Sequence, residues 1–155
     1  MEKDIKKDYM AIAIEYARKA AKRGEVPVGA VIVCGGKIIA TGYNMREGRR
    51  NALAHAEIIA INAACKKLKS WRLDDSIIYV TLQPCLMCAG AILNARIKTV
   101  VIGARDDKQK ADESALEIYN KNSLNWKTEV IFDKCEECSQ ILKAFFAGKR
   151  YNTAT

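Results

Sequence analysis

The amino-acid sequence predicts an α/β sandwich whose sheet contains parallel pairs of strands. Three observations support this fold class: an amphipathic helical pattern opens the chain, two apolar runs separated by a glycine pair follow it, and strand-like runs then alternate with helical segments. Such an alternation is typical of sheets with parallel strands. Because open α/β sheets tend to build their sites at strand-to-helix turns, those turns are where we look for chemistry.

The first half of the chain is expected to form a helix, a hairpin and a second helix. Gly24 ends the opening helix. One face of that helix carries Ile5, Tyr9, Ile12, Tyr16 and Ala20. The Gly35-Gly36 pair signals a turn between strands at residues 28–34 and 37–43. A polar, arginine-rich loop then leads to a helix from about residue 54 to residue 69.

The second half is expected to contribute three more strands, at residues 77–82, 97–103 and 128–132. Pro84 ends the first of them and starts a short helix to about Asn94, because the missing N–H of proline costs nothing in the first turn of a helix. A charged loop over residues 105–113 precedes another short helix. Asp133 is expected to cap a closing helix that runs to about Lys149.

Length and composition suit one domain over residues 1–155, of which half are hydrophobic. The net charge of +8 favours a phosphate-bearing partner such as nucleic acid, although a solvated basic surface would give the same value. The charged start has no signal-peptide pattern, and no apolar run is long enough to span a membrane. We therefore expect a cytoplasmic protein whose six cysteines are metal ligands, core residues or redox thiols.

Cys85 and Cys88 follow Pro84 at the start of a predicted helix, three residues apart, so both sulfurs point to one face. The partial positive charge of a helix N-terminus favours thiolates, and converging thiolates suit zinc. His55 is the only histidine in the chain and is the expected third ligand. A zinc ion with three protein ligands keeps a position for water, which ionises near neutral pH and acts as a hydroxide nucleophile.

Glu57 lies two residues after His55, near the start of the same predicted helix, so that both can face the metal. A carboxylate beside the zinc can take a proton from the bound water and deliver protons to a substrate and to its leaving group. A lone histidine, a lone C-x-x-C pair or a lone glutamate would be weak signals. The combination of H-x-E and, about thirty residues later, P-C-x-x-C is the specific signature of zinc nucleobase deaminases.

At these residues the chain resembles the cytidine deaminase superfamily, and most of all the bacterial tRNA adenosine deaminases, which convert wobble adenosine to inosine. The resemblance covers nearly the whole chain. The matching segments are Gly24–Val31, His55–Ile58, Tyr79–Leu82, Pro84–Ile92, Phe145-Phe146 and Arg150. It implies a three-layer α/β/α sandwich with a mixed sheet of about five strands, and a homodimer whose active sites lie near the subunit interface.

The resemblance also implies roles for single residues. It assigns zinc to His55, Cys85 and Cys88 and the proton shuttle to Glu57. Substrate contacts are expected from Val28, from Asn44 on the target base, and from Asp106 and Lys108 near the flipped nucleotide. For RNA, the resemblance implies contacts from Phe145, Phe146 and Arg150 in the last helix. Independently of it, the basic side chains of Arg46, Arg49 and Arg50 in the loop before the zinc helix could meet phosphates. Alternatively, these arginines form only a solvated rim of the site and bind no phosphate.

Four departures from the family pattern leave the substrate open. They are Asn51-Ala52-Leu53 for Asp-Pro-Thr, Gln83 for Glu, Gln109–Ser114 for a stretch of small residues, and Asn125-Trp126-Lys127 at the place of a histidine. They favour an alternative function, the deamination of a free purine such as guanine or a modified guanine. The features that favour an RNA substrate are the basic net charge and the C-terminal Phe145, Phe146 and Arg150.

A second alternative is a noncatalytic zinc module that binds nucleic acid or a protein partner. In that case Cys135 and Cys138 would complete a four-cysteine set with Cys85 and Cys88. The long separation of the two pairs and the apolar spacing after Cys138 instead favour Cys138 as a core residue and Cys135 as a residue near the surface. The two remaining cysteines, Cys34 and Cys65, are also interpreted as small core residues.

Overall fold

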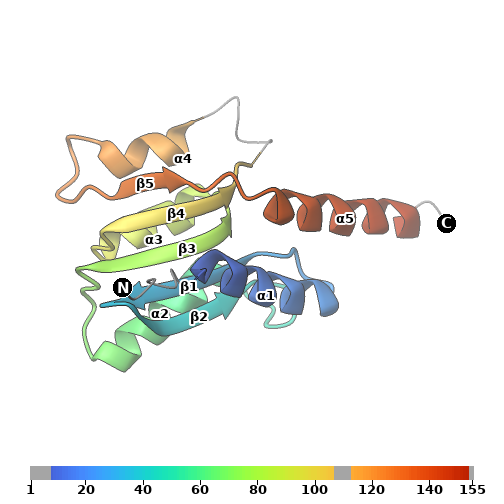
Figure 1. Ribbon diagram of the computed structural model, residues 1–155, viewed down its shortest axis with the longest axis horizontal. Helices are drawn as coiled ribbons and strands as arrows, with labels where there is room; N and C mark the ends of the chain where they lie inside the picture. The colour runs from blue at the N-terminus through green and yellow to red at the C-terminus, as the bar shows by residue number, and fades with distance from the viewer. Residues whose placement is uncertain (1–7, 107–112, 154–155) are drawn as a thin grey trace, which may run out of the picture.

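A mixed five-stranded sheet forms the centre of the computed structural model, which describes residues 8–106 and 113–153 (Figure 1). Its strands are β1 (Gly29–Cys34), β2 (Lys37–Tyr43), β3 (Ser76–Leu82), β4 (Thr99–Ala104) and β5 (Glu129–Phe132). They lie in the order β2-β1-β3-β4-β5. β1 pairs antiparallel with β2 and β3, whereas β3, β4 and β5 are parallel. The predicted parallel pairs and mixed sheet are thereby confirmed.

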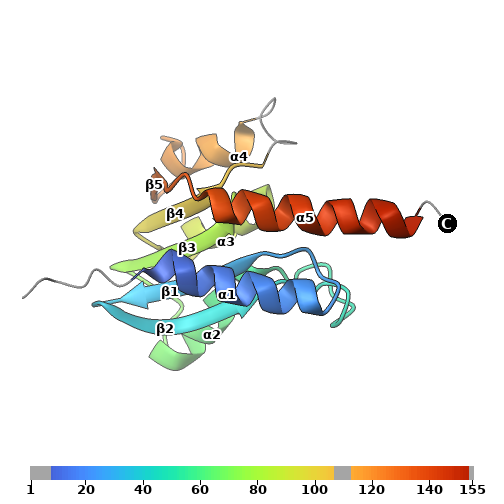
Figure 2. The ribbon, with the colours of Figure 1, turned by 45° about the vertical axis from the view of Figure 1, so that its right-hand side comes forward.

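Helices cover both faces of this sheet, as Figures 1 and 2 show. They are α1 (Tyr9–Lys22), α2 (Ala56–Leu68), α3 (Leu86–Asn94), α4 (Ser114–Glu117), the 3-10 turn η2 (Ile118–Asn120) and α5 (Glu136–Thr153). One buried cluster joins the sheet to α2 and α3, and a second joins it to α1 and the start of α5. The expected three-layer α/β/α arrangement is therefore confirmed. None of the described helices is both long and apolar enough to cross a membrane.

The opening helix buries a different face from the predicted one. Its buried residues are Met10, Ala13, Ile14, Ala17 and Ala20, so only Ala20 belongs to both sets. The predicted Tyr9, Ile12 and Tyr16 are half-buried on its flank, and Ile5 lies outside the described residues. The reason is close packing: a Cβ atom on Gly29 of β1 would lie 2.0 Å from the Ala13 carbonyl oxygen. Only small side chains allow that approach, and their weak hydrophobic signal hides the buried face.

Two predicted helix starts are also corrected. α3 begins at Leu86 with Cys85 as its N-cap, so Pro84 precedes the helix. Just before it, the chain still pairs with β4, because the Gln83 N–H donates to the Ala104 oxygen. α5 begins at Glu136, and Asp133 does not cap it because its N–H donates to Ile102 and continues the sheet. The Gly35-Gly36 turn is confirmed, with φ values of 58° and 75°.

Candidate active site

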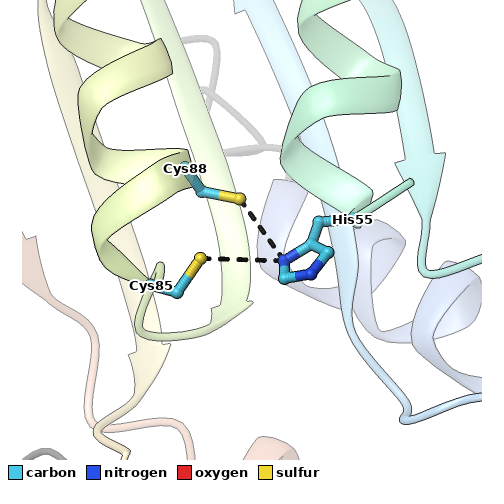
Figure 3. A group of neighbouring side chains, drawn as sticks. All are labelled: His55, Cys85 and Cys88. Carbon is cyan, nitrogen blue, oxygen red and sulfur yellow. Dashed lines mark hydrogen bonds between the residues drawn. The ribbon is translucent and has the colours of Figure 1, made fainter. Parts of the chain in front are cut away.

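The N-termini of α2 and α3 face each other and carry the three predicted metal ligands. His55 is the N-cap of α2 and Cys85 the N-cap of α3, and neither side chain is used to cap its own helix. The His55 Nδ1 atom lies 3.7 Å from the Cys85 sulfur and 3.6 Å from the Cys88 sulfur (Figure 3). All three ligand atoms lie within 4.8 Å of one another, which makes the group able to hold a metal ion.

The charges of this cluster fit a cation. A hydrogen bond from Cys88 is the largest effect that lowers the pKa of Cys85, to about 5. The same hydrogen bond, burial and the nearby Glu57 carboxylate raise the pKa of Cys88. A divalent cation between the two sulfurs and His55 would allow both cysteines to be thiolates. Two thiolates and one imidazole are a donor set that suits tetrahedral zinc.

Glu57 lies in the first turn of α2, two residues after His55, and its side chain is only 3% exposed. Burial raises the pKa of its carboxyl group to about 7. The residue lines the same cavity as His55 and Cys85. A carboxylate in this place can exchange protons with a molecule bound beside the cluster.

The cavity at these helix ends has a volume of about 190 Å³ and gathers most of the predicted substrate residues. Its lining residues are Val26, Val28, Asn44, Arg46, His55, Ala56, Glu57, Leu82, Gln83, Cys85 and Asp106. Arg49 and Arg50 do not line it but lie exposed on the adjoining loop. Lys108 lies outside the described residues.

The predicted C-terminal contacts lie apart from this cavity. Phe145 and Phe146 pack edge to face on α5, with ring centroids 5.5 Å apart, and Phe146 is 38% exposed. α5 projects from the body beyond its first turns (Figures 1 and 2). Arg150 belongs to this helix, but its side chain lies outside the described part of the chain.

Sequence reasoning missed three buried groups around the site. The Glu25 carboxylate, 3% exposed, accepts hydrogen bonds from the backbone of the loop that follows β2. The side-chain oxygen of Gln83 accepts the Asp106 N–H at 3.3 Å and so holds the cavity wall after β4. Tyr119 is 1% exposed, and no described residue hydrogen-bonds its hydroxyl group. Burial and the charges of Glu57, Cys88 and Cys85 raise the pKa of Tyr119.

The sequence carries little or no signal for these three buried residues. Glu25 belongs to a segment that carried the family resemblance, but a buried anchor for a loop twenty residues later leaves no local pattern. Gln83 stood out as a departure without a role. Tyr119 lies in the short 3-10 turn η2, which is too short for a periodic pattern to predict burial.

Two of the departures from the family pattern lie away from the histidine and cysteine cluster. Asn51 forms an Asx turn in which its side-chain oxygen accepts the Leu53 N–H at 2.8 Å, and Leu53 is 56% exposed. Trp126 is half-buried and donates its ring N–H to the Ile97 oxygen at the opposite end of β4 from the cavity. These substitutions leave the histidine and cysteine cluster intact. The stretch from Gln109 to Ser114 lies largely outside the described residues.

The four-cysteine alternative is wrong. Cys135 and Cys138 pack in the cluster with α1, on the opposite face of the sheet from α2 and α3. Cys138 is buried and Cys135 partly exposed, as expected. Cys34 and Cys65 are only partly buried, so the expectation that both are core residues is wrong for Cys34; Cys65 packs against the core from its edge.

A comparison of sequences finds deaminases. The pattern of the MafB19-like deaminase family matches residues 5–150. Over 143 residues, the chain is 45% identical to the tRNA-specific adenosine deaminase of Bacillus subtilis (strain 168), in an alignment that covers 92% of this chain and 89% of that protein.

A comparison of structures agrees with that result. A structure from work on A-to-I editing by tRNA:A34 deaminases at the wobble position of transfer RNA superposes with a TM-score of 0.80 at 39% identity, over 86% of this chain and 98% of that chain. The guanine deaminase from Bacillus subtilis superposes with a TM-score of 0.63 at 33% identity, over 95% of both chains.

Proposed function

Because this chain belongs to the MafB19-like deaminase family, we propose that it is a zinc-dependent deaminase that converts adenosine to inosine at the wobble position of a tRNA anticodon. In chemical class it is a hydrolase that acts on the C–N bond of an amidine. The relatives with 45% identity over nearly their whole length are tRNA-specific adenosine deaminases, which supports this substrate over a free base. An unpaired anticodon loop can offer its base to a pocket without the opening of a duplex.

The observation that carries the mechanism is the buried Glu57 carboxylate in the cavity beside His55, Cys85 and Cys88. We assign zinc to the imidazole and the two sulfurs. When bound there, zinc supplies a Lewis acid that activates water. Glu57 can take one proton from the water on a carboxylate oxygen and deliver it to the ring nitrogen. It can then take the second proton from the hydroxyl group added to the ring carbon and pass it to the amino group, which leaves as ammonia.

Asn44 and Val28 are proposed to position the base against these groups. The Asn44 side-chain oxygen accepts the Arg46 N–H at 3.3 Å, and its amide donates to the Val26 oxygen at 3.3 Å. These contacts fix the amide at the cavity wall, so that little side-chain freedom is lost when a ligand binds. Asp106 faces the cavity from the end of β4.

The grip on RNA is proposed to come from two basic regions. Arg46 lines the cavity, and Arg49 and Arg50 lie exposed beside it, where phosphates of a loop held over the cavity would pass. Phe145, Phe146, Arg150 and Lys108 are kept as further RNA contacts on the strength of the family resemblance.

The assembly and the cellular place of the enzyme are also proposals. We propose that residues 1–155 act as one deaminase domain and that two copies form a homodimer with active sites near the interface, as the resemblance implies. A tRNA substrate would place the enzyme in the cytoplasm. The noncatalytic zinc module is not retained, because the matched proteins are deaminases and the four-cysteine set does not form.

A free purine, guanine above all, remains the second candidate substrate. The specific observation in its favour is the likeness to a guanine deaminase at 33% identity, together with the departures at Asn51 and Gln83. This reaction would use the same cluster and the same Glu57 but would need no contact to phosphates.

The test is mass spectrometry of an anticodon stem-loop with adenosine at the wobble position, incubated with the zinc-loaded protein. Conversion to inosine by the wild type but not by Glu57→Gln supports both the substrate and the role of Glu57. Absence of conversion, with ammonia released from guanine in a parallel panel of free purines, would replace the tRNA proposal by the second candidate.

A further inference from the structure

A second pair of cysteines lies at the start of α5, and the deaminase reaction gives it no role. Cys135 directly precedes the first residue of this helix, and Cys138 is its third residue. The pair packs in the cluster formed with α1, on the face of the sheet opposite to α2 and α3. It is therefore separate from the cluster at His55.

Cys135 and Cys138 are three residues apart, the first just before α5 and the second in its first turn. Side chains three residues apart in a helix are neighbours, with about 5–6 Å between their Cβ atoms. A disulfide needs about 3.5–4.5 Å, so a small adjustment of the first turn brings the sulfurs together. The Cys135 N–H donates to the Gly103 oxygen at 2.8 Å, which fixes the start of the turn against β4.

Gly103 also leaves room for the second sulfur. A Cβ atom on Gly103 would lie 2.6 Å from the Cys138 sulfur and 3.1 Å from the Met10 sulfur, so only glycine fits at this point of β4. The Cys138 side chain is 2% exposed, whereas Cys135 is partly exposed. Burial, followed by a hydrogen bond with the Cys135 thiol, raises the pKa of Cys138. The two side chains thus pack in one cluster, with one thiol accessible and one protected.

We propose that Cys135 and Cys138 form a reversible intramolecular disulfide by exchange with a low-molecular-weight disulfide. The Cys135 thiolate attacks one sulfur of the small disulfide, whose S–S bond breaks and releases one thiol. The Cys138 thiolate then attacks the Cys135 sulfur, the mixed S–S bond breaks, and a second thiol leaves. Two electrons pass from the protein pair to the small disulfide, and the two protons of the pair pass to the released thiols.

The site fits this chemistry because one thiol of the pair is reachable from solvent and the other is not. An accessible attacking thiol followed by a buried resolving thiol three residues later is the arrangement that closes a disulfide inside the protein instead of leaving a mixed one. The closed bond would fix the turn from which α5 leaves the body and which Glu137 also ties to α1 through an ion pair with Arg18.

The test uses the zinc-loaded, full-length protein equilibrated in glutathione buffers of rising disulfide content, followed by alkylation of free thiols and mapping of tryptic peptides. Cleavage after Lys134 and Lys143 isolates both cysteines in one peptide with no other cysteine. We expect this peptide to lose two hydrogens and escape alkylation, reversibly, while Cys34 and Cys65 stay alkylated. These two partly exposed cysteines are the internal control for oxidation that depends on exposure alone.

Zinc content is measured in the same samples, so that oxidation of Cys85 and Cys88 is detected as a loss of metal. Cys135→Ser, a change at a partly exposed position, should leave Cys138 reduced throughout. Full alkylation of the wild-type peptide at the highest disulfide content would overturn the proposal. A lasting glutathione adduct on Cys135 without closure would overturn it as well.

Discussion

Glu25 and Gly48 are joined by a short hydrogen bond, in which the Gly48 N–H donates to the buried Glu25 carboxylate at 2.8 Å. The neighbouring Glu47 N–H donates to the other carboxylate oxygen at 3.2 Å. This single side chain, placed before β1, therefore holds the loop that carries Asn44 and Arg46 to the cavity. The shape of the cavity rim depends on a contact between segments more than twenty residues apart.

Replacement of Glu25 should loosen this loop. Glu25→Ala leaves two backbone N–H groups without their acceptor and is expected to cost about 1–3 kcal/mol of stability in urea unfolding. It should also raise KM for the anticodon stem-loop more than it lowers kcat, because zinc and Glu57 are untouched. Glu47→Gln is the matched control, since it removes the same charge from an exposed side chain of the same loop. Equal effects of the two changes would show that the anchor does not matter.

Metal content separates the proposed ligands from the proposed proton shuttle. The wild type should hold about one zinc per chain. His55→Ala should lose zinc and turnover together, because it removes one of three donors within 4.8 Å. Glu57→Gln should keep zinc and lose turnover, because an amide cannot carry the proton. Metal analysis by mass spectrometry with a turnover assay measures both, and full zinc in His55→Ala would contradict the ligand assignment.

The sequence was sufficient to predict features that depend on spacing along the chain. The alternation of strands and helices predicts the mixed sheet, and the spacing of His55, Glu57, Cys85 and Cys88 predicts a cluster that the structure does bring together. The mixed sheet and the cluster both follow from local sequence patterns. The cluster forms because the parallel arrangement of the strands brings the N-termini of α2 and α3 side by side.

Other features could not be predicted because their cause lies in distant parts of the chain. The buried face of α1 follows from the close approach of Ala13 to Gly29, and small residues give little hydrophobic signal. The start of α5 is delayed because residues after β5 still pair with β4, which a capping preference at Asp133 does not reveal. The loop anchor at Glu25 likewise needs the folded arrangement to be recognised.

The packing of α2 on β2 gives a test of how the metal cluster is positioned. A Cβ atom on Gly42 would lie 2.4 Å from the Ala56 oxygen and 2.9 Å from the Ala60 nitrogen. Gly42→Ala should therefore push α2 outward, cost about 1–3 kcal/mol of stability and weaken zinc binding through displacement of His55. Thermal unfolding and zinc titration measure the two effects.

Gly90→Ala in α3 is the control for that change. A Cβ atom on Gly90 would meet nothing within 4 Å, and alanine is favoured over glycine inside a helix by about 0.5–1 kcal/mol. This variant should be slightly stabilised and should bind zinc like the wild type. If Gly42→Ala behaved in the same way, α2 would not be held by close backbone contact.

Removal of the Tyr119 hydroxyl group is expected to leave stability unchanged or to increase it. It is buried and has no hydrogen-bond partner among the described residues. A buried polar group without a partner costs about 1–3 kcal/mol, so Tyr119→Phe should be neutral or stabilising by up to that amount. Urea unfolding measures the change, and a clear loss of stability would show that the hydroxyl finds a partner in solution.

Salt dependence distinguishes a polymer substrate from a free base. If the arginine loop meets phosphates, binding of the stem-loop should weaken steeply with salt, and Arg49→Ala should reduce the slope of log K against log salt by about 0.7–0.9 for one lost contact. Lys66→Ala removes an exposed charge near the far end of α2 and should leave the slope unchanged. Binding is measured by fluorescence anisotropy with the Glu57→Gln variant, so that no turnover occurs. A salt-independent affinity, unchanged by Arg49→Ala, would indicate that the enzyme recognises the base alone and would shift the assignment toward a free purine.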